Sequence, residues 1–293
     1  MRKPLLGAFL AVLLLGAGAA PAMATGHDAG APTAATPVAV APVAAQEQIQ
    51  AVDFAGTVAL SNCSGSVVRT PTSQPGDPAL VLSNGHCLET GFPAAGQVVV
   101  DRASTRSFTL LNSAGTGVGT LRASKIAYGT MTDTDVALYQ LTSTYAQIQS
   151  AYGISALELN ATRPVQGTAI KVVSGYWKRI YSCDIDGFAH LLKEGSWTWK
   201  DSVRYTSSCN TIGGTSGSPV IDDATGKVVA VNNTGNESGA RCTLNNPCEV
   251  DENGTVTVRQ GINYAQETYG IVACVGAGNK IDLSRAGCTL PKP

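Results

Sequence analysis

Residues 213–220 read Gly-Gly-Thr-Ser-Gly-Ser-Pro-Val, and this stretch decides how the rest of the chain is interpreted. Glycine lets the backbone turn sharply and brings N–H groups close to a ligand atom. A serine hydroxyl on such a turn, next to two N–H groups, is the arrangement that acyl transfer needs. A Gly/Ser-rich surface turn is the alternative interpretation, because the same residue types form ordinary turns. Other parts of the chain decide between these two interpretations.

One of the three histidines, His86, follows an apolar run in the segment Ser83-Asn84-Gly85-His86-Cys87. A single histidine on a turn is commonly satisfied by backbone groups, and it has no catalytic meaning without a partner. Asp135 is a candidate partner because it directly precedes the apolar residues 136–138. A carboxylate buried at the start of a strand can fix the tautomer of an imidazole and stabilise its charged form. Turn formation is the alternative, and it suits Asp133 better than Asp135.

The chain as a whole is typical of an all-β protein. It has 293 residues, of which 44% are hydrophobic and 14% are charged, and short strand-like runs alternate with Gly, Pro, Asn and Asp. This spacing indicates an antiparallel barrel or sandwich, and the absence of βαβ alternation argues against a parallel sheet. Residues 145–163 are less strand-like and could connect two sets of strands. The expected strands are 54–60, 65–70, 79–82, 97–100, 107–111, 135–141, 168–174, 197–206, 218–221, 227–231, 255–259 and 270–275.

Together, the three motifs resemble those of the chymotrypsin-like (trypsin-fold, S1-type) serine peptidases. Residues 83–87 are similar to that family's Thr-Ala-Ala-His-Cys, residues 135–138 to Asp-Ile-Ala-Leu, and residues 214–219 to Gly-Asp-Ser-Gly-Gly-Pro with two changes. The version with Ser-Gly-Ser-Pro resembles the bacterial glutamyl-endopeptidase, or V8-like, branch. The chain order of histidine, aspartate and serine also agrees, and the resemblance covers roughly residues 52–275.

The resemblance implies two antiparallel six-stranded β-barrels with the active site between them, over residues 51–150 and 151–293. It also implies a secreted serine endopeptidase that acts through an acyl-enzyme. Ser216 would be the nucleophile, His86 the general base and acid, and Asp135 the residue that orients His86. The N–H groups of Gly214 and Ser216 would form the oxyanion hole.

The chain departs from the family pattern at Thr215 and at Ser218, and the V8-like branch tolerates the serine at the second position. Thr215 replaces the aspartate that pairs with a new N-terminus in zymogen-activated relatives, so we expect no activation by that ion pair. The specificity pocket would have its floor near Asn210 and Thr211, and no carboxylate lies between residues 202 and 221 to select Arg or Lys. Its wall would comprise Asn232, Asn233 and Thr234, without the histidine that is typical of Glu-specific relatives. We therefore expect a neutral polar pocket, unless these residues are simply solvent-facing polar groups.

Residues 1–24 are predicted to be a signal peptide. A basic start, an apolar run over residues 5–15 and Ala22-Met23-Ala24 favour export and cleavage after Ala24. The run is too short for a membrane anchor, and no second span follows. Residues 25–50 are rich in Ala, Pro, Thr and Val, and form either a flexible leader or a short pro-segment. We therefore expect a secreted, extracellular protein.

The eight cysteines fit an oxidising compartment. The resemblance implies a disulfide between Cys63 and Cys87, close to His86. For the others we favour Cys183–Cys209, Cys242–Cys248 and Cys274–Cys288, with Cys209–Cys242 as a rival bridge. No Cys-x-x-Cys or His-x-x-x-His pair indicates zinc, so we expect no metal and no cofactor.

Polypeptide substrates are the expected partners, and we expect a monomer. No basic patch indicates nucleic acid. An α/β-hydrolase esterase would need Gly-x-Ser-x-Gly between a strand and a helix, whereas Ser218 occupies the last glycine position and a strand-like run follows. A purely structural cell-wall protein would leave the three motifs unexplained. A catalytically silent binding protein on the same scaffold is the main alternative.

Overall fold

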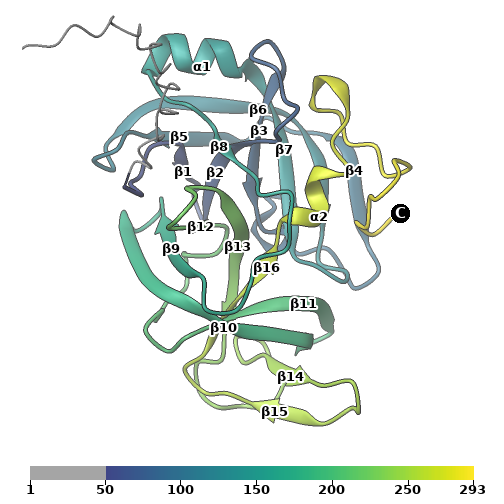
Figure 1. Cartoon of the computed structure of the whole chain (residues 1–293). Coiled ribbons are helices and arrows are strands. Elements are labelled where there is room, and N and C mark those ends of the chain that lie inside the picture. The colour runs from purple at the N-terminus through teal and green to yellow at the C-terminus, as the bar shows by residue number, and fades with distance from the viewer. Residues whose placement is uncertain (1–50) are drawn as a thin grey trace, which may run out of the picture. The chain divides into compact units, whose positions relative to one another are not determined.

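Six antiparallel strands of the first half of the chain form a closed ring. The computed structural model describes residues 51–293, so the predicted signal peptide and leader lie outside the described residues. The strand β1 pairs with both β2 and β5, and this closes the order β1-β5-β6-β7-β3-β2 into a barrel (Figure 1). The strands of the ring are β1 (Thr57–Ala59), β2 (Ser64–Arg69), β3 (Pro78–Ser83), β5 (Ser107–Leu111), β6 (Gly117–Thr130) and β7 (Val136–Thr144).

Two further strands lie at the margins of this barrel. The strand β4 (Val98–Ala103) pairs with β6, and β8 (Leu157–Glu158) pairs in parallel with β2. Between β7 and β8 lies the helix α1 (Tyr145–Tyr152), within the segment that was expected to connect the two sets of strands. Thr144 caps it reciprocally with Gln147, a capping box that stabilises the first turn.

The second barrel closes in the same way. Its ring runs β11-β16-β13-β12-β9-β10, and β10 pairs with β11 to complete it. A short hairpin of β14 (Cys248–Val250) and β15 (Val256–Val258) extends from the far end of β10 (Figure 1). The expected all-β fold of two barrels is thus confirmed. The ring strands are β9 (Ala169–Ser174), β10 (Arg179–Glu194), β11 (Trp197–Tyr205), β12 (Pro219–Asp222), β13 (Val228–Gly235) and β16 (Asn263–Glu267).

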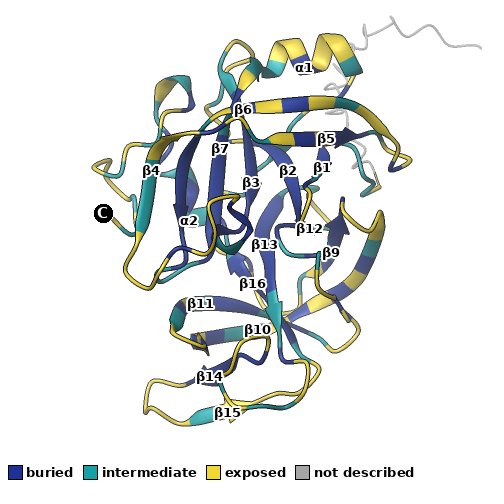
Figure 2. Ribbon diagram, turned by 180° about the vertical axis from the view of Figure 1, so that it is seen from behind, coloured by how far each residue is buried: buried dark blue, intermediate teal, exposed yellow. Residues whose placement is uncertain are grey.

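Strand alternation explains why the central strands are apolar without interruption. In β3, Ala79 and Val81 point into the first barrel, whereas Leu80 and Leu82 belong to a separate cluster outside it. That outer cluster also contains Val173 and Val231 of the second barrel. Successive side chains of a strand face opposite sides, so a strand that is buried on both sides needs apolar residues at every position. Figure 2 shows β3, β7, β12 and β13 as buried along most of their length.

The C-terminal segment returns from the second barrel to the first. After β16 come the short helices α2 (Tyr269–Val272) and η2 (Ala277–Asn279). Ile271 and Leu290 join the outer apolar cluster that also contains Leu80. Asn279 donates through its side-chain amide to the carbonyl of Pro78, at 2.9 Å, and so ties this segment to β3.

Four disulfides hold these parts of the chain together. They join Cys63 to Cys87, Cys183 to Cys209, Cys242 to Cys248 and Cys274 to Cys288, and these are the pairs favoured from the sequence. The rival bridge between Cys209 and Cys242 is absent from the described part of the chain. Residues 51–293 contain no helix that is long and apolar enough to cross a bilayer.

Candidate active site

His86 lies on a short 3-10 helix, η1 (Gly85–Cys87), directly after β3. Two features determine its place. Cys87 is bonded to Cys63 beside β2, and Gly85 packs so closely on β6 that a Cβ there would overlap the carbonyl oxygen of Thr130. Only glycine fits a backbone approach of this kind. The side chain of His86 is 17% exposed, so the imidazole faces solvent along one edge.

Asp135 precedes β7 and is completely buried. Its Oδ2 lies 2.7 Å from Nδ1 of His86, and its Oδ1 accepts a 3.0 Å hydrogen bond from the backbone N–H of His86. The side chain of Asn84 donates to the carbonyl of Asp135, at 2.8 Å. Both carboxylate oxygens are therefore committed to one residue, which fixes the plane of the imidazole and assigns Nδ1 as its donor.

Burial alone would lower the pKa of His86, because it disfavours the charged form. The charge and the hydrogen bond of Asp135 act in the opposite direction, with a smaller contribution from Glu194. Their sum raises the pKa of His86 above its ordinary value. The arrangement thus stabilises an imidazolium that would form during proton transfer.

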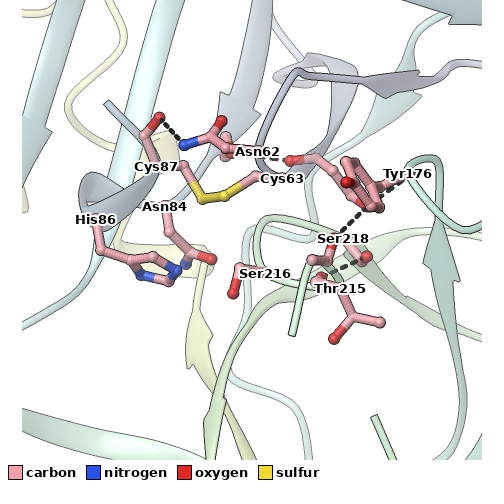
Figure 3. The surroundings of a disulfide bond; sticks show 12 residues. Asn62, Cys63, Asn84, His86, Cys87, Tyr176, Thr215, Ser216 and Ser218 are labelled. Carbon is pink, nitrogen blue, oxygen red and sulfur yellow. Dashed lines mark hydrogen bonds between the residues drawn. A yellow bond between two sulfur atoms is a disulfide. The ribbon is translucent and has the colours of Figure 1, made fainter. Parts of the chain in front are cut away.

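Ser216 lies on the glycine-rich turn before β12, and its hydroxyl donates to the carbonyl oxygen of Asn233 at 3.3 Å. No hydrogen bond joins Ser216 to His86 among the described residues. Both side chains line the same cavity, however, and Figure 3 shows both of them near the Cys63–Cys87 disulfide. The turn itself reaches the first barrel, because the N–H of Ser64 donates to the carbonyl of Ser216 at 2.8 Å.

The carbonyl groups of residues 213–216 in this turn all accept hydrogen bonds, whereas the N–H groups of Gly213, Gly214 and Ser216 have no acceptor among the described residues. Gly213 accepts from the indole of Trp177 at 2.8 Å, and Gly214 accepts from the hydroxyl of Ser64 at 3.2 Å. Within residues 51–293, the N–H groups of Gly214 and Ser216 donate to no protein group. Gly214 adopts a φ of +88°, a conformation that strongly favours glycine. Two unpaired N–H groups beside a serine hydroxyl can bind an oxyanion.

The cavity that contains these groups has a volume of about 240 Å³. Thr211 and all three expected wall residues line it, but they differ in their partners. Asn232 donates to Thr215 and accepts from Tyr205, so it supports the turn. Asn233 is 3% exposed, and neither atom of its amide has a partner in the described chain. Asn210, expected on the floor, is exposed and lies outside the lining.

A buried carboxylate in the cavity was missed by the sequence analysis. Glu194 lies at the end of β10 and is 4% exposed, and it shares the lining with His86 and Ser216. The pocket was expected to be neutral because the residues around the serine motif, from 202 to 221, include no carboxylate. Glu194 enters from a hairpin on another strand, and nothing in its own neighbourhood of the sequence indicates that it faces a cleft.

The described residues contain one cluster that has the residue types of a metal site, namely Cys63, His86 and Cys87. The two sulfur atoms are bonded to each other, so neither is a thiolate. His86 is then the only ligand left in the cluster, and the group does not fit a metal ion.

Comparison with known proteins gives a family match. A family model described as a trypsin-like peptidase domain matches residues 63–231, which include all three motif positions. No curated protein matches the chain. Similar solved structures include the MamO protease domain of Magnetospirillum magneticum, with 13% identity and a TM-score of 0.44 over 73% of this chain and 92% of that one.

Two other similar structures are a Glu endopeptidase in complex with MPD and the protease Anisep of Arthrobacter nicotinovorans. The first has 16% identity and a TM-score of 0.43 over 76% of this chain and 88% of that one. The second has 17% identity and a TM-score of 0.41 over 74% of this chain and 90% of that one.

Proposed function

The chain belongs to the trypsin-like peptidase family, and from this premise we propose that it is an active serine endopeptidase that cleaves polypeptides through His86, Asp135 and Ser216. The observation that carries the proposal is the 2.7 Å contact between His86 and Asp135. Burial of the Asp135 carboxylate costs free energy of folding. Because both of its oxygens bind His86, it also orients this histidine as a base. Asp135, His86 and Ser216 line one cavity, which supports a shared role in acyl transfer.

Ser216 must turn toward His86 before it can react. Its present hydrogen bond to the Asn233 carbonyl is long, at 3.3 Å, and therefore weak. One rotation about the Cα–Cβ bond redirects the hydroxyl, and such rotations take picoseconds to nanoseconds at accessible sites. Nucleophile–base hydrogen bonds in free enzymes are often loose and tighten when substrate binds. The observed rotamer is thus compatible with an active enzyme.

The proposed reaction uses these groups in sequence. Oγ of Ser216 attacks the carbonyl carbon of the peptide bond while Nε2 of His86 takes the hydroxyl proton. The tetrahedral oxyanion accepts hydrogen bonds from the N–H groups of Gly214 and Ser216, and His86 then protonates the leaving amine. Water attacks the resulting ester with His86 again as base, which releases the acid and restores Ser216.

The turn needs no newly formed N-terminus to hold it in place. Thr215 donates to the carbonyl of Ile212 through both its N–H and its hydroxyl, and it accepts from the amide of Asn232. This neutral network occupies the place of the ion pair that activates zymogens in other members of the family. We propose that the described fold is competent without such activation.

We propose secretion on two grounds. Four disulfides are typical of proteins that fold in an oxidising compartment, outside the cell or in the periplasm. The predicted signal peptide over residues 1–24 provides a route of export.

The decisive experiment is labelling of the purified protein with a fluorophosphonate, read by intact mass. We expect one adduct on the parent protein and none on Ser216→Ala, because only an activated serine next to an oxyanion site reacts at a useful rate. Hydrolysis of casein and of a nitrophenyl ester should accompany labelling. A protein that acts on the ester alone would be an esterase.

A catalytically silent binding protein is the second candidate, and the hydrogen bond of Ser216 to Asn233 instead of His86 is the observation that favours it. This candidate predicts a folded protein that takes no fluorophosphonate and cleaves neither substrate. Thermal unfolding of the same sample before and after labelling separates it from a protein that simply failed to fold.

A further inference from the structure

Glu194 is a buried acid without a basic partner. The other deeply placed glutamates have one: Glu249 lies 2.9 Å from Arg204, and Glu267 lies 3.4 Å from Arg163. No Lys or Arg side chain lies within 4.0 Å of Glu194 among the described residues, and none lines the cavity. A buried charge is normally paired, because desolvation is expensive. The carboxylate of Glu194 therefore lacks a positively charged partner, and a cation in the cavity could provide one.

The hydrogen bonds of Glu194 fix its position and leave room for such a cation. Oε2 accepts from the hydroxyl of Thr234 at 2.6 Å, and Oε1 accepts from the N–H of Asn245 at 2.8 Å. Both partners are donors, which is the environment of an ionised carboxylate. A carboxylate has about four lone-pair sites, so further donors can be accepted. Burial nevertheless raises the pKa of Glu194, which is the mark of a charge that lacks full compensation.

A second group in the cavity also lacks a partner. The amide of Asn233, the residue before Thr234, is buried and both of its polar atoms are unpaired. Buried polar atoms without partners are rare in folded proteins and commonly await a ligand or a water molecule. Asn233 and Glu194 both line the cavity, but the amide atoms of Asn233 are shielded from solvent, so the carboxylate of Glu194 is the acceptor that we assign to an ammonium or guanidinium group.

The location of Glu194 relative to His86 indicates which substrate residue it would meet. Glu194 and His86 line the same cavity, and the charge of Glu194 contributes to the raised pKa of His86. Side chains of an extended peptide alternate between opposite sides. With the side chain of the acyl residue near Thr211, alternation turns the preceding side chain to the other side of the peptide, and we infer that this preceding side chain meets Glu194.

We propose that Glu194 is a specificity-determining residue that selects substrates with a lysine or arginine immediately before the acyl residue. This inference rests on the proposed peptidase function. It also replaces the neutral cleft expected from the sequence with one that carries a fixed negative charge at a defined subsite.

The first test uses the unmodified protein and two fluorogenic peptides that differ only at that position, arginine in one and citrulline in the other. Citrulline has the same shape without the charge. We expect kcat/KM to be at least about tenfold higher for arginine, and most of this ratio to persist in 0.5 M salt, because buried pairs are screened far less than exposed ones. Equal rates for the two peptides would overturn the proposal.

The second test compares Glu194→Gln with Glu252→Gln, which removes the same charge at an exposed position outside the cavity. The ratio of the two kcat/KM values is measured within each variant, so losses of total activity do not affect it. We expect the ratio to fall to about threefold or less in Glu194→Gln and to stay at the parent value in Glu252→Gln. An unchanged ratio in Glu194→Gln would contradict the proposal.

Fluorophosphonate titration separates this inference from the proposed function. If the protein takes the label but hydrolyses both peptides at equal rates, only the Glu194 proposal is wrong. If folded protein takes no label, the peptidase proposal is wrong. The same two peptides are then used as ligands, and their binding is measured by fluorescence anisotropy. Tighter binding of arginine than of citrulline, lost in Glu194→Gln, would still support a cation subsite, and equal binding would overturn it.

Discussion

Nε1 of Trp177 donates a 2.8 Å hydrogen bond to the carbonyl oxygen of Gly213, the first glycine of the serine turn. The C=O and N–H groups of one trans peptide point in opposite directions. The bond therefore turns the N–H of Gly214 away from Trp177, and the hydroxyl of Ser64 holds the next carbonyl. Trp177, which lies outside the turn, thus orients one of the two proposed oxyanion donors, the N–H of Gly214, before any substrate arrives.

Replacing Trp177 by phenylalanine should weaken the oxyanion site without changing substrate binding. We expect kcat to fall about tenfold or more with KM nearly unchanged, because complete loss of one oxyanion donor costs about 10²- to 10³-fold in kcat. The affinity for a peptide boronic acid, which mimics the tetrahedral intermediate, should fall with kcat. Tyr176→Phe is the matched control, since it removes a hydroxyl from the ring that contacts Trp177. A rise in KM alone would instead assign Trp177 to substrate binding.

His86→Ala and Ser216→Ala should each lower kcat by roughly 10⁴- to 10⁶-fold, and the double variant should be no worse than either alone. Groups that act in one proton transfer lose their function together. Burst kinetics with a nitrophenyl ester measure the three variants against the parent. Losses that multiply in the double variant would show that the two residues act independently.

The raised pKa of His86 predicts the acid limb of activity. The base must be neutral, so kcat/KM should fall as pH drops through a pKa that lies above the ordinary value of about 6.5. Asp135→Asn removes the charge that raises this pKa, so the residual activity should persist to lower pH than in the parent. A pH series from 5 to 9 with an ester substrate tests both, and a limb that does not move in Asp135→Asn would refute the assignment.

Gly85→Ala should destabilise the protein and displace His86. A Cβ at this position would overlap the Thr130 carbonyl, and overpacking of a core typically costs about 1–3 kcal/mol. Gly76→Ala is the control, because nothing lies within 4 Å of its Cβ position and its φ is not positive. Thermal unfolding and ester hydrolysis measure the two effects. Equal melting temperatures of the two variants would contradict the close approach.

The motif-bearing parts of the fold could be predicted because their apolar residues are consecutive or directly flank a motif. The long strands β6 and β10 were missed, since Gly, Ser, Asp and Lys interrupt their apolar residues on the exposed side. Residues 270–275 were expected to be a strand but include most of α2. A short apolar run suits either element, and only its packing against the first barrel decides.

The candidate site was predictable to the same extent. His86, Asp135 and Ser216 occur in short sequence motifs, so their proposed roles could be predicted from the neighbouring residues. Glu194 and Trp177 stand in no motif, and they reach the site through the pairing of β10 with β11 and the turn after β9. Contacts between distant segments of this kind depend on register, which a single sequence does not reveal.

The return of the C-terminal segment to the first barrel limits how widely the cleft can open. The segment follows β16 of the second barrel, and Asn279 binds the carbonyl of Pro78 in β3 of the first barrel, so separating the two barrels would break this hydrogen bond. For the proposed peptidase we therefore expect cleavage of segments that a target protein can release from its own structure, and no cleavage of the same segments while they are folded.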